Sequence, residues 1–140
     1  MIAYIKRYPL SLIVIAIIWY LSFFTPPETE LNEIPYIDKM VHVCMYGGLS
    51  VTLWIEYLFR HRSLMLKRLI TGAVVCPILM SGCIEVLQAT CTETRSGDWM
   101  DFAANCTGVI LASVLGYYIC KPVIWKYKKL LLSDKNIANE

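Results

Sequence analysis

Four long apolar blocks, separated by short charged segments, constrain the fold of this chain more than any other feature. They run from about 9 to 25, 39 to 59, 69 to 89 and 101 to 120, and a helix of about 20 residues crosses the roughly 30 Å hydrocarbon core of a bilayer. The 140 residues are 57% hydrophobic and only 17% charged, well below the charged fraction of a soluble domain. The sequence therefore predicts an all-α membrane protein with a bundle of four transmembrane helices.

The basic residues predict the orientation of these helices. An even number of predicted crossings separates the three basic segments, so all three lie on the same side of the membrane. Cytoplasmic segments of membrane proteins are rich in lysine and arginine, so this side is the cytoplasm. These residues are Lys6 and Arg7, then Arg60, Arg62, Lys67 and Arg68, then Lys121, Lys126, Lys128 and Lys129. We therefore expect a multi-pass inner-membrane protein with both termini in the cytoplasm.

Two segments lie outside the predicted transmembrane helices, one at each end of the sequence. Residues 1–8 form a short cytoplasmic N-terminus, and residues 121–140 form a basic amphipathic tail that we expect to lie on the anionic inner leaflet. The net charge of +2 gives no indication of nucleic-acid binding. The six cysteines form no C-x-x-C pair, so we interpret them as small apolar packing residues.

Polar residues gather at the predicted outer ends of the second, third and fourth helices. Helical spacing places Asp38, His42 and Tyr46 on one face of the second helix. It places Glu85 and Gln88 on one face of the third helix, and Asp101 and Asn105 on one face of the fourth. The candidate ligand-binding residues are Asp38, Lys39, His42, Tyr46, Glu85, Gln88, Arg95, Asp98, Asp101 and Asn105. Ionisable groups inside a membrane normally face a partner or a water-filled cavity, which makes a functional site the default hypothesis.

A purely structural interpretation stands beside this one. Asp38 and Asp101 are suitably placed to cap the second and fourth helices, and acids at helix ends often pair across loops. The first helix contributes almost no polar residues, and Glu56 is expected to pair with Arg60 near the inner end. Four acids face Lys39 and Arg95 in the outer region, so two negative charges need protonation, a cation or a cationic ligand group to balance them.

The same residues carry a family resemblance. The pattern Asp38-Lys39-x-x-His42-x-x-x-Tyr46, then Glu85-x-x-Gln88, then Arg95-x-x-Asp98-x-x-Asp101-x-x-x-Asn105-x-x-Gly108 resembles the VanZ-like family over about residues 36 to 118. The resemblance implies a small bacterial membrane protein. The founding member of that family is associated with low-level resistance to teicoplanin, a lipoglycopeptide antibiotic. No reaction comes with the resemblance.

Three functions remain open at this stage. The first is binding of an amphiphile at the outer face, such as a lipoglycopeptide or a lipid-linked component of the cell envelope. The second is an enzyme that acts on a lipid-linked substrate, with His42, Glu85 and Asp101 as candidate acid–base groups. No cofactor is predicted, although the carboxylates and His42 could hold a divalent cation. The third, a small transporter or channel, is disfavoured because the polar residues stop about halfway across. The expected partners are membrane lipids, and the oligomeric state stays open.

Overall fold

The computed structural model describes residues 7–24, 34–61, 63–92 and 97–137, with the side chains described up to Leu132. Its described residues form helices and no strand, which confirms the all-α prediction. The helices are α2 (Pro9–Phe23), α3 (Ile37–Arg60), α4 (Leu66–Ile70), α5 (Cys76–Cys91), α6 (Trp99–Leu115) and α7 (Lys121–Ile137). The π-helical turn η2 (Thr71–Val75) joins α4 to α5, and η3 (Gly116–Cys120) joins α6 to α7.

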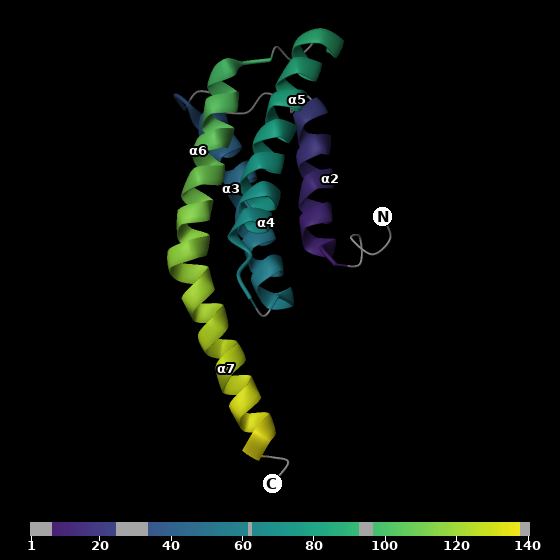
Figure 1. Cartoon of the computed structure of the whole chain (residues 1–140). Coiled ribbons are helices and arrows are strands. Elements are labelled where there is room, and N and C mark those ends of the chain that lie inside the picture. The colour runs from purple at the N-terminus through teal and green to yellow at the C-terminus, as the bar shows by residue number, and fades with distance from the viewer. Residues whose placement is uncertain (1–6, 25–33, 62, 93–96, 138–140) are drawn as a thin grey trace.

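Helix α3 lies at the centre of the bundle (Figure 1). It packs most extensively against α6, and α2 packs against both α3 and α5. One group of buried apolar side chains surrounds Trp54 and Leu58, and a second surrounds Tyr46 and Val109. Large apolar side chains such as Leu79 and Tyr118 face outward with more than 60% of their surface exposed. Large apolar side chains on the outer surface as well as in the interior are typical of helices in lipid.

Two continuous helices are long and apolar enough to cross a membrane, namely Leu66–Cys91 and Trp99–Leu132. The apolar helix α2 has only 15 residues, and α3 has sufficient length but carries Lys39, His42 and Glu56. Length and composition thus identify two of the four expected spans. The observed helices agree with the expected blocks to within a few residues at most ends.

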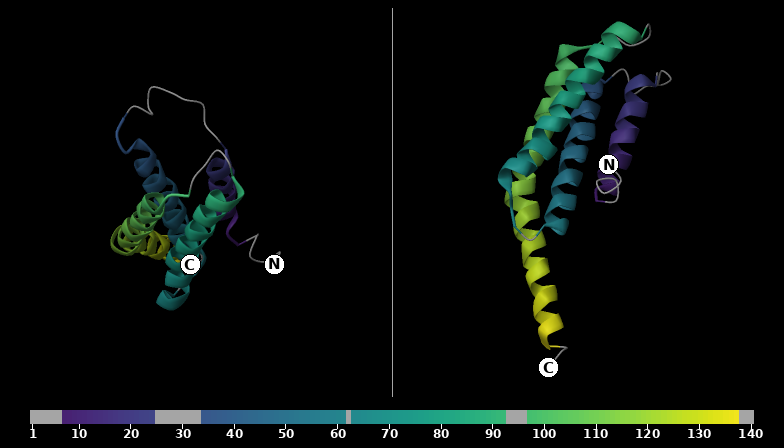
Figure 2. Two further views of the ribbon diagram at one scale, coloured as in Figure 1. Left: turned by 90° about the horizontal axis from the view of Figure 1, so that it is seen from above. Right: turned by 45° about the vertical axis from the view of Figure 1, so that its right-hand side comes forward.

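The largest difference from expectation lies at the end of the fourth block. We predicted a helix that stops near residue 120 and a separate tail, but α6 continues through η3 into α7 without a break. The helix projects beyond the rest of the bundle toward the C-terminus (Figure 2, right). Thirty-four residues at 1.5 Å each span about 51 Å, which exceeds the hydrocarbon core by about 20 Å.

Each π-helical turn comes directly before a proline-containing turn. Pro77 and Pro122 are each the second residue after η2 and η3. Proline cannot donate a hydrogen bond to the carbonyl four residues earlier, and its ring crowds that carbonyl. For Pro77 this carbonyl belongs to Ala73, and it accepts a bond from Ser50 Oγ at 2.7 Å instead. A side chain of α3 thereby satisfies a backbone acceptor that proline leaves free.

Glycine sets the close approach of α3 and α6. A Cβ atom on Gly108 would lie 2.3 Å from the carbonyl oxygen of Val43, closer than any real contact of this kind. The facing residue on α3 is Gly47, whose own Cβ would lie 3.4 Å from the Gly108 carbonyl oxygen. Small residues at such a crossing allow backbones to pack closely in a membrane, where apolar burial provides little attraction between helices.

The structure corrects two interpretations of the first helix. Glu56 does not pair with Arg60 but accepts hydrogen bonds from the first turn of α2, from Leu10 N at 3.1 Å, Ser11 N at 3.0 Å and Ser11 Oγ at 2.5 Å. These amides have no partner within α2, because the first four N–H groups of a helix never do. A negative charge also complements the helix dipole there. Helix α2 therefore has a polar face, with Ser11 and Ser22 both buried.

Candidate functional site

Lys39 lies at the centre of a cluster of acids at one end of the bundle. Its Nζ atom is 2.9 Å from Asp38 Oδ2, 2.7 Å from Asp98 Oδ2 and 2.5 Å from Asp101 Oδ1. Asp38 and Lys39 belong to the first turn of α3, whereas Asp98 and Asp101 begin α6. One ammonium group therefore joins the ends of two helices through charge-assisted hydrogen bonds.

Asp98 rather than Asp101 is the residue that caps α6. Its side chain accepts a hydrogen bond from Met100 N at 2.8 Å, while Asp101 lies in the first turn. Helix α3 begins after Tyr36, which has a left-handed backbone and provides no side-chain cap, so Asp38 is not a cap either. The two capping roles predicted for Asp38 and Asp101 are therefore wrong. The hydrogen bond from Lys39, with that from Met100 N, holds the pKa of Asp98 below its ordinary value.

His42 connects this cluster to the interior of the bundle. Its Nε2 atom lies 3.5 Å from Asp101 Oδ2, and its Nδ1 atom lies 3.1 Å from Asn105 Oδ1. Asn105 is fully buried and donates from Nδ2 to Ser81 Oγ at 2.8 Å. With the amide oxygen of Asn105 as acceptor, Nδ1 carries the proton, and Nε2 faces the carboxylate. A line of polar contacts thus runs from α6 through α3 to α5.

Glu85 approaches the same region from α5. Its Oε2 atom accepts a hydrogen bond from Asp98 N at 3.0 Å, so the carboxylate binds the backbone at the start of α6. Gly97 allows this approach, because a Cβ there would lie 2.3 Å from the Glu85 carbonyl oxygen. Glu85 is buried, with 7% of its surface exposed. Glu85 is thus the residue that α5 contributes to the cluster.

Two of the predicted site residues have other positions. Gln88 lies outside the cluster: its Nε2 donates to the Ser22 carbonyl oxygen of α2 at 2.7 Å and thereby satisfies a free acceptor at the end of that helix. Tyr46 is buried, and its hydroxyl has no hydrogen-bond partner among the residues that the structure describes. Arg95, and Ser96 beside it, lie outside the described residues.

We define the acidic cluster as the seven predicted residues that these contacts join. They are Asp38, Lys39, His42, Glu85, Asp98, Asp101 and Asn105. Sequence reasoning missed Ser81 and Gly97. Ser81 precedes Glu85 by one helical turn, so the spacing of the third helix could have identified it. The role of Gly97 depends on a contact between helices, which no local pattern reveals.

The inner side chains of the acidic cluster are largely buried, whereas two of its carboxylates are exposed at the surface. The side chains of Asp38 and Asp98 are 59% and 42% exposed, whereas those of Lys39, Asp101 and His42 are at most 22% exposed. The cavity beside Glu85 and Asp98 measures only about 80 Å³. The described part of the cluster contains four carboxylates, three of them on Lys39, and one lysine, so negative charge is in excess when His42 is neutral.

Lys39 also affects what the carboxylates can bind. Within the described ranges, no group of three His, Cys, Asp or Glu side chains is arranged to hold a metal ion. The ammonium of Lys39 occupies the position between three carboxylates where a divalent cation would need their oxygens. The hypothesis of a divalent cation at this site therefore finds no preformed ligand set in the described residues.

These features define an all-α protein with two long apolar helices and a polar cluster at one end of its bundle. The sequence matches the VanZ/LLP1 family model over residues 3–123 and belongs to this family. The family and the two apolar helices indicate a membrane protein. Comparisons with curated proteins and with solved structures found no match.

Proposed function

We propose that this member of the VanZ/LLP1 family is a multi-pass protein of the bacterial inner membrane whose acidic cluster faces away from the cytoplasm. The described basic residues near the opposite end of α3, including Arg60, Lys67 and Arg68, support this orientation, because positive segments remain inside. Cys91 tests it, since this exposed thiol ends α5 on the side of the cluster. A membrane-impermeant maleimide should label Cys91 in intact spheroplasts, and Cys91→Ser should remove that label. Labelling only after lysis would show that Cys91 faces the cytoplasm and would contradict the proposed orientation.

The function that the geometry supports best is recognition of an amphiphile with a cationic head group at the outer leaflet. One observation carries this proposal: three carboxylates meet at a single lysine with a fourth, Glu85, bound to the backbone beside them, and two of the acids are substantially exposed. A cationic group that approaches Asp38 and Asp98 gains from the excess negative charge without displacing Lys39. The cavity of about 80 Å³ favours recognition at the surface over deep enclosure.

Apolar side chains beside the acidic cluster suit the tail of such a ligand. Met40 and Val41 follow Lys39 on α3, and Trp99 and Met100 follow Asp98 on α6, each with about half or more of its surface exposed. An acyl chain could lie along these side chains while the head group remains at the carboxylates. Teicoplanin, which the family resemblance suggests, has an acyl chain as well as a polar head.

A binding experiment tests this proposal directly. Teicoplanin would be titrated into the protein in nanodiscs of neutral lipid, with the deacylated glycopeptide core as a tail control. Asp38→Asn with Asp98→Asn should weaken binding about tenfold, which corresponds to about 1.4 kcal/mol. Asparagine keeps the cap of α6. Asp134→Asn with Glu140→Gln removes the same number of carboxylates from another part of the chain and is the matched control. Binding that is equal in all variants, or equal for the core, would contradict the proposal.

The arrangement of His42 supports acid–base catalysis on a lipid-linked substrate as a second candidate. Asn105 orients the ring through Nδ1, and Nε2 lies 3.5 Å from the Asp101 carboxylate, so Nε2 is the ring nitrogen that could exchange a proton. The probe would be undecaprenyl pyrophosphate in detergent micelles. Turnover that disappears in His42→Gln while the thermal melt is retained would favour this function. Absence of turnover in the wild-type protein, with teicoplanin bound, would favour binding.

A further inference from the structure

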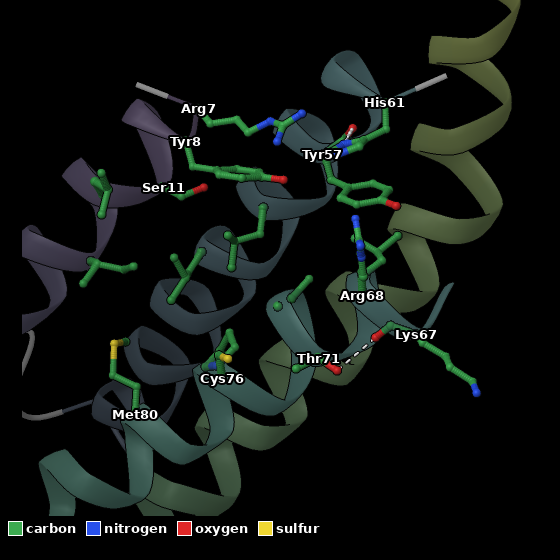
Figure 3. A pocket seen from close by; sticks show the side chains of 18 residues that line it. Arg7, Tyr8, Ser11, Tyr57, His61, Lys67, Arg68, Thr71, Cys76 and Met80 are labelled. Carbon is green, nitrogen blue, oxygen red and sulfur yellow. Dashed lines mark hydrogen bonds between the residues drawn. The ribbon is translucent and has the colours of Figure 1, made fainter. Parts of the chain in front are cut away.

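A large cavity in the described structure lies at the opposite end from the acidic cluster. It measures about 1020 Å³ and opens between α2, α3 and the continuous helix of α4, η2 and α5. Figure 3 shows Arg7, Tyr8, Tyr57 and Arg68 gathered at one end of it and Met80 near the other. From Arg68 to Met80 the helix rises about 18 Å, more than half of the hydrocarbon core.

The charges that line this cavity have one sign. Arg7, Lys67 and Arg68 all line it, together with His61, and none of its lining residues is an aspartate or glutamate. In the described residues, no acid forms an ion pair with any of the three cations. Glu56, the nearest buried carboxylate, is engaged with the first turn of α2. The mouth of the cavity is therefore basic, and in the described residues no carboxylate lines it or pairs with its cations.

The walls beyond the mouth are apolar. Leu12 and Ile15 come from α2, Leu49 and Leu53 from α3, and Pro77 and Met80 from α5. Their small neighbours in η2, which include Gly72 and Ala73, widen the space between the helices. A free phosphate ion would use only the mouth of this cavity. A molecule with an anionic head and an acyl chain fits the charge at the mouth and the hydrocarbon along the walls.

We infer that this cavity binds one anionic phospholipid, whose phosphate lies between Arg7 and Arg68 and whose acyl chain extends toward Met80. Two arginines from separate elements can both donate to phosphate oxygens, and the planar guanidinium suits phosphate better than a lysine ammonium does. Tyr8, beside Arg7 at the mouth, adds a hydroxyl donor at the depth of the head group. The bound lipid would fill the space between α2 and α5 and so join α2 to the bundle. This inference does not depend on the proposed function of the acidic cluster.

The test compares lipids and variants by native mass spectrometry and by thermal melts in neutral detergent. Dioleoylphosphatidylglycerol should remain bound to the wild-type protein and raise its melting temperature, whereas dioleoylphosphatidylcholine and inorganic phosphate should not. Arg7→Gln with Arg68→Gln should weaken retention of the anionic lipid at least tenfold. Both arginines are exposed, so the fold should survive. Lys126→Gln with Lys129→Gln removes the same charge from α7 and should leave retention unchanged.

A second variant blocks the cavity without changing its charge. A Cβ on Gly72 would meet no atom within 4 Å, so Gly72→Leu should be tolerated and should place its side chain in the space beside the acyl chain. It should reduce lipid retention while circular dichroism shows an unchanged helix content. Equal retention of both lipids by the wild-type protein would overturn the inference. Unchanged retention in both the double arginine variant and Gly72→Leu would also overturn it.

Discussion

Lys39 Nζ lies 2.7 Å from Asp98 Oδ2, although the two residues are 59 positions apart in the chain. The contact joins the first turn of α3 to the cap of α6, and two further acids bind the same ammonium group. Lys39 is thus the one cation in the described part of the acidic cluster. Its removal should affect both helices whose ends it joins.

Lys39→Gln should destabilise the bundle by about 2 kcal/mol, because hydrogen bonds to charged groups contribute about 1.5–3 kcal/mol and the acids would then repel one another. The lysine side chain is 22% exposed, so solvent screening lowers the effect below that of a fully buried pair. Thermal unfolding in detergent micelles measures this loss. Lys126→Gln is the control, because it removes a lysine from the exposed surface of α7. Equal melting temperatures for the two variants would refute the central role of Lys39.

The same contact predicts a dependence of stability on pH. Lys39 lowers the pKa of Asp98 in the folded protein, so the folded state binds this proton less readily than the unfolded chain does. The stabilisation is therefore complete above the unfolded pKa, near the ordinary value of 3.8, and is lost as the pH falls through the lower folded value. Melting temperatures should decline below about pH 4 in the wild-type protein. Asp98→Asn should flatten this decline. An unchanged decline of the melting temperature below pH 4 in this variant would show that Asp98 is not its cause.

Gly108→Ala should destabilise the protein by about 1–3 kcal/mol, the usual cost of overpacking. The new methyl group would lie 2.3 Å from the Val43 carbonyl oxygen and would push α3 and α6 apart at their crossing. Gly48→Ala is the matched control, since its Cβ would meet no atom within 4 Å and alanine favours a helix by about 1 kcal/mol over glycine. Thermal melts should therefore move in opposite directions. A loss in both variants would show that these helices need glycine for backbone flexibility, and that the contact with Val43 is not the cause of the loss.

The sequence predicted the helices and most of the acidic cluster for one physical reason. Both depend on patterns along a single helix: apolar length predicted the helices, and the i, i+4 spacing placed His42 and Asp101 at the same end. The role of Lys39 was less accessible, because it depends on how the ends of α3 and α6 meet. Glu56 was misassigned for the same reason. Its local neighbour Arg60 offered an ion pair one turn away, whereas its real partners are amides of α2 that lie 45 and 46 positions earlier.

Glu56→Ala should release the N-terminal turn of α2. The amides of Leu10 and Ser11 would lose their acceptor, and loss of a cap costs about 0.5–2 kcal/mol. Hydrogen exchange should accelerate in the first turn of α2 while the α3–α6 crossing keeps its protection. Glu56→Gln should have a smaller effect, because the amide oxygen can still accept one bond but lacks the charge that complements the helix dipole. Faster exchange throughout the bundle would indicate general unfolding instead.

Ser50 and Pro77 should show coupled effects on stability. Ser50 Oγ donates to the Ala73 carbonyl oxygen at 2.7 Å, and Pro77 is the residue whose missing N–H leaves that oxygen free. Ser50→Ala should cost about 1–3 kcal/mol in the wild-type chain, because a buried carbonyl would remain unsatisfied. In a Pro77→Ala background the new N–H can donate to Ala73, so Ser50→Ala should cost much less.

A double-mutant cycle of thermal or denaturant unfolding measures this coupling. Thr52→Val is the control on the same helix, because Thr52 Oγ1 donates only to the Gly48 carbonyl oxygen within α3. Its cost should be the same with and without Pro77. Identical costs for Ser50→Ala in both backgrounds would show that η2 already satisfies Ala73. The hydroxyl of Ser50 would then stabilise α3 against η2 by packing alone.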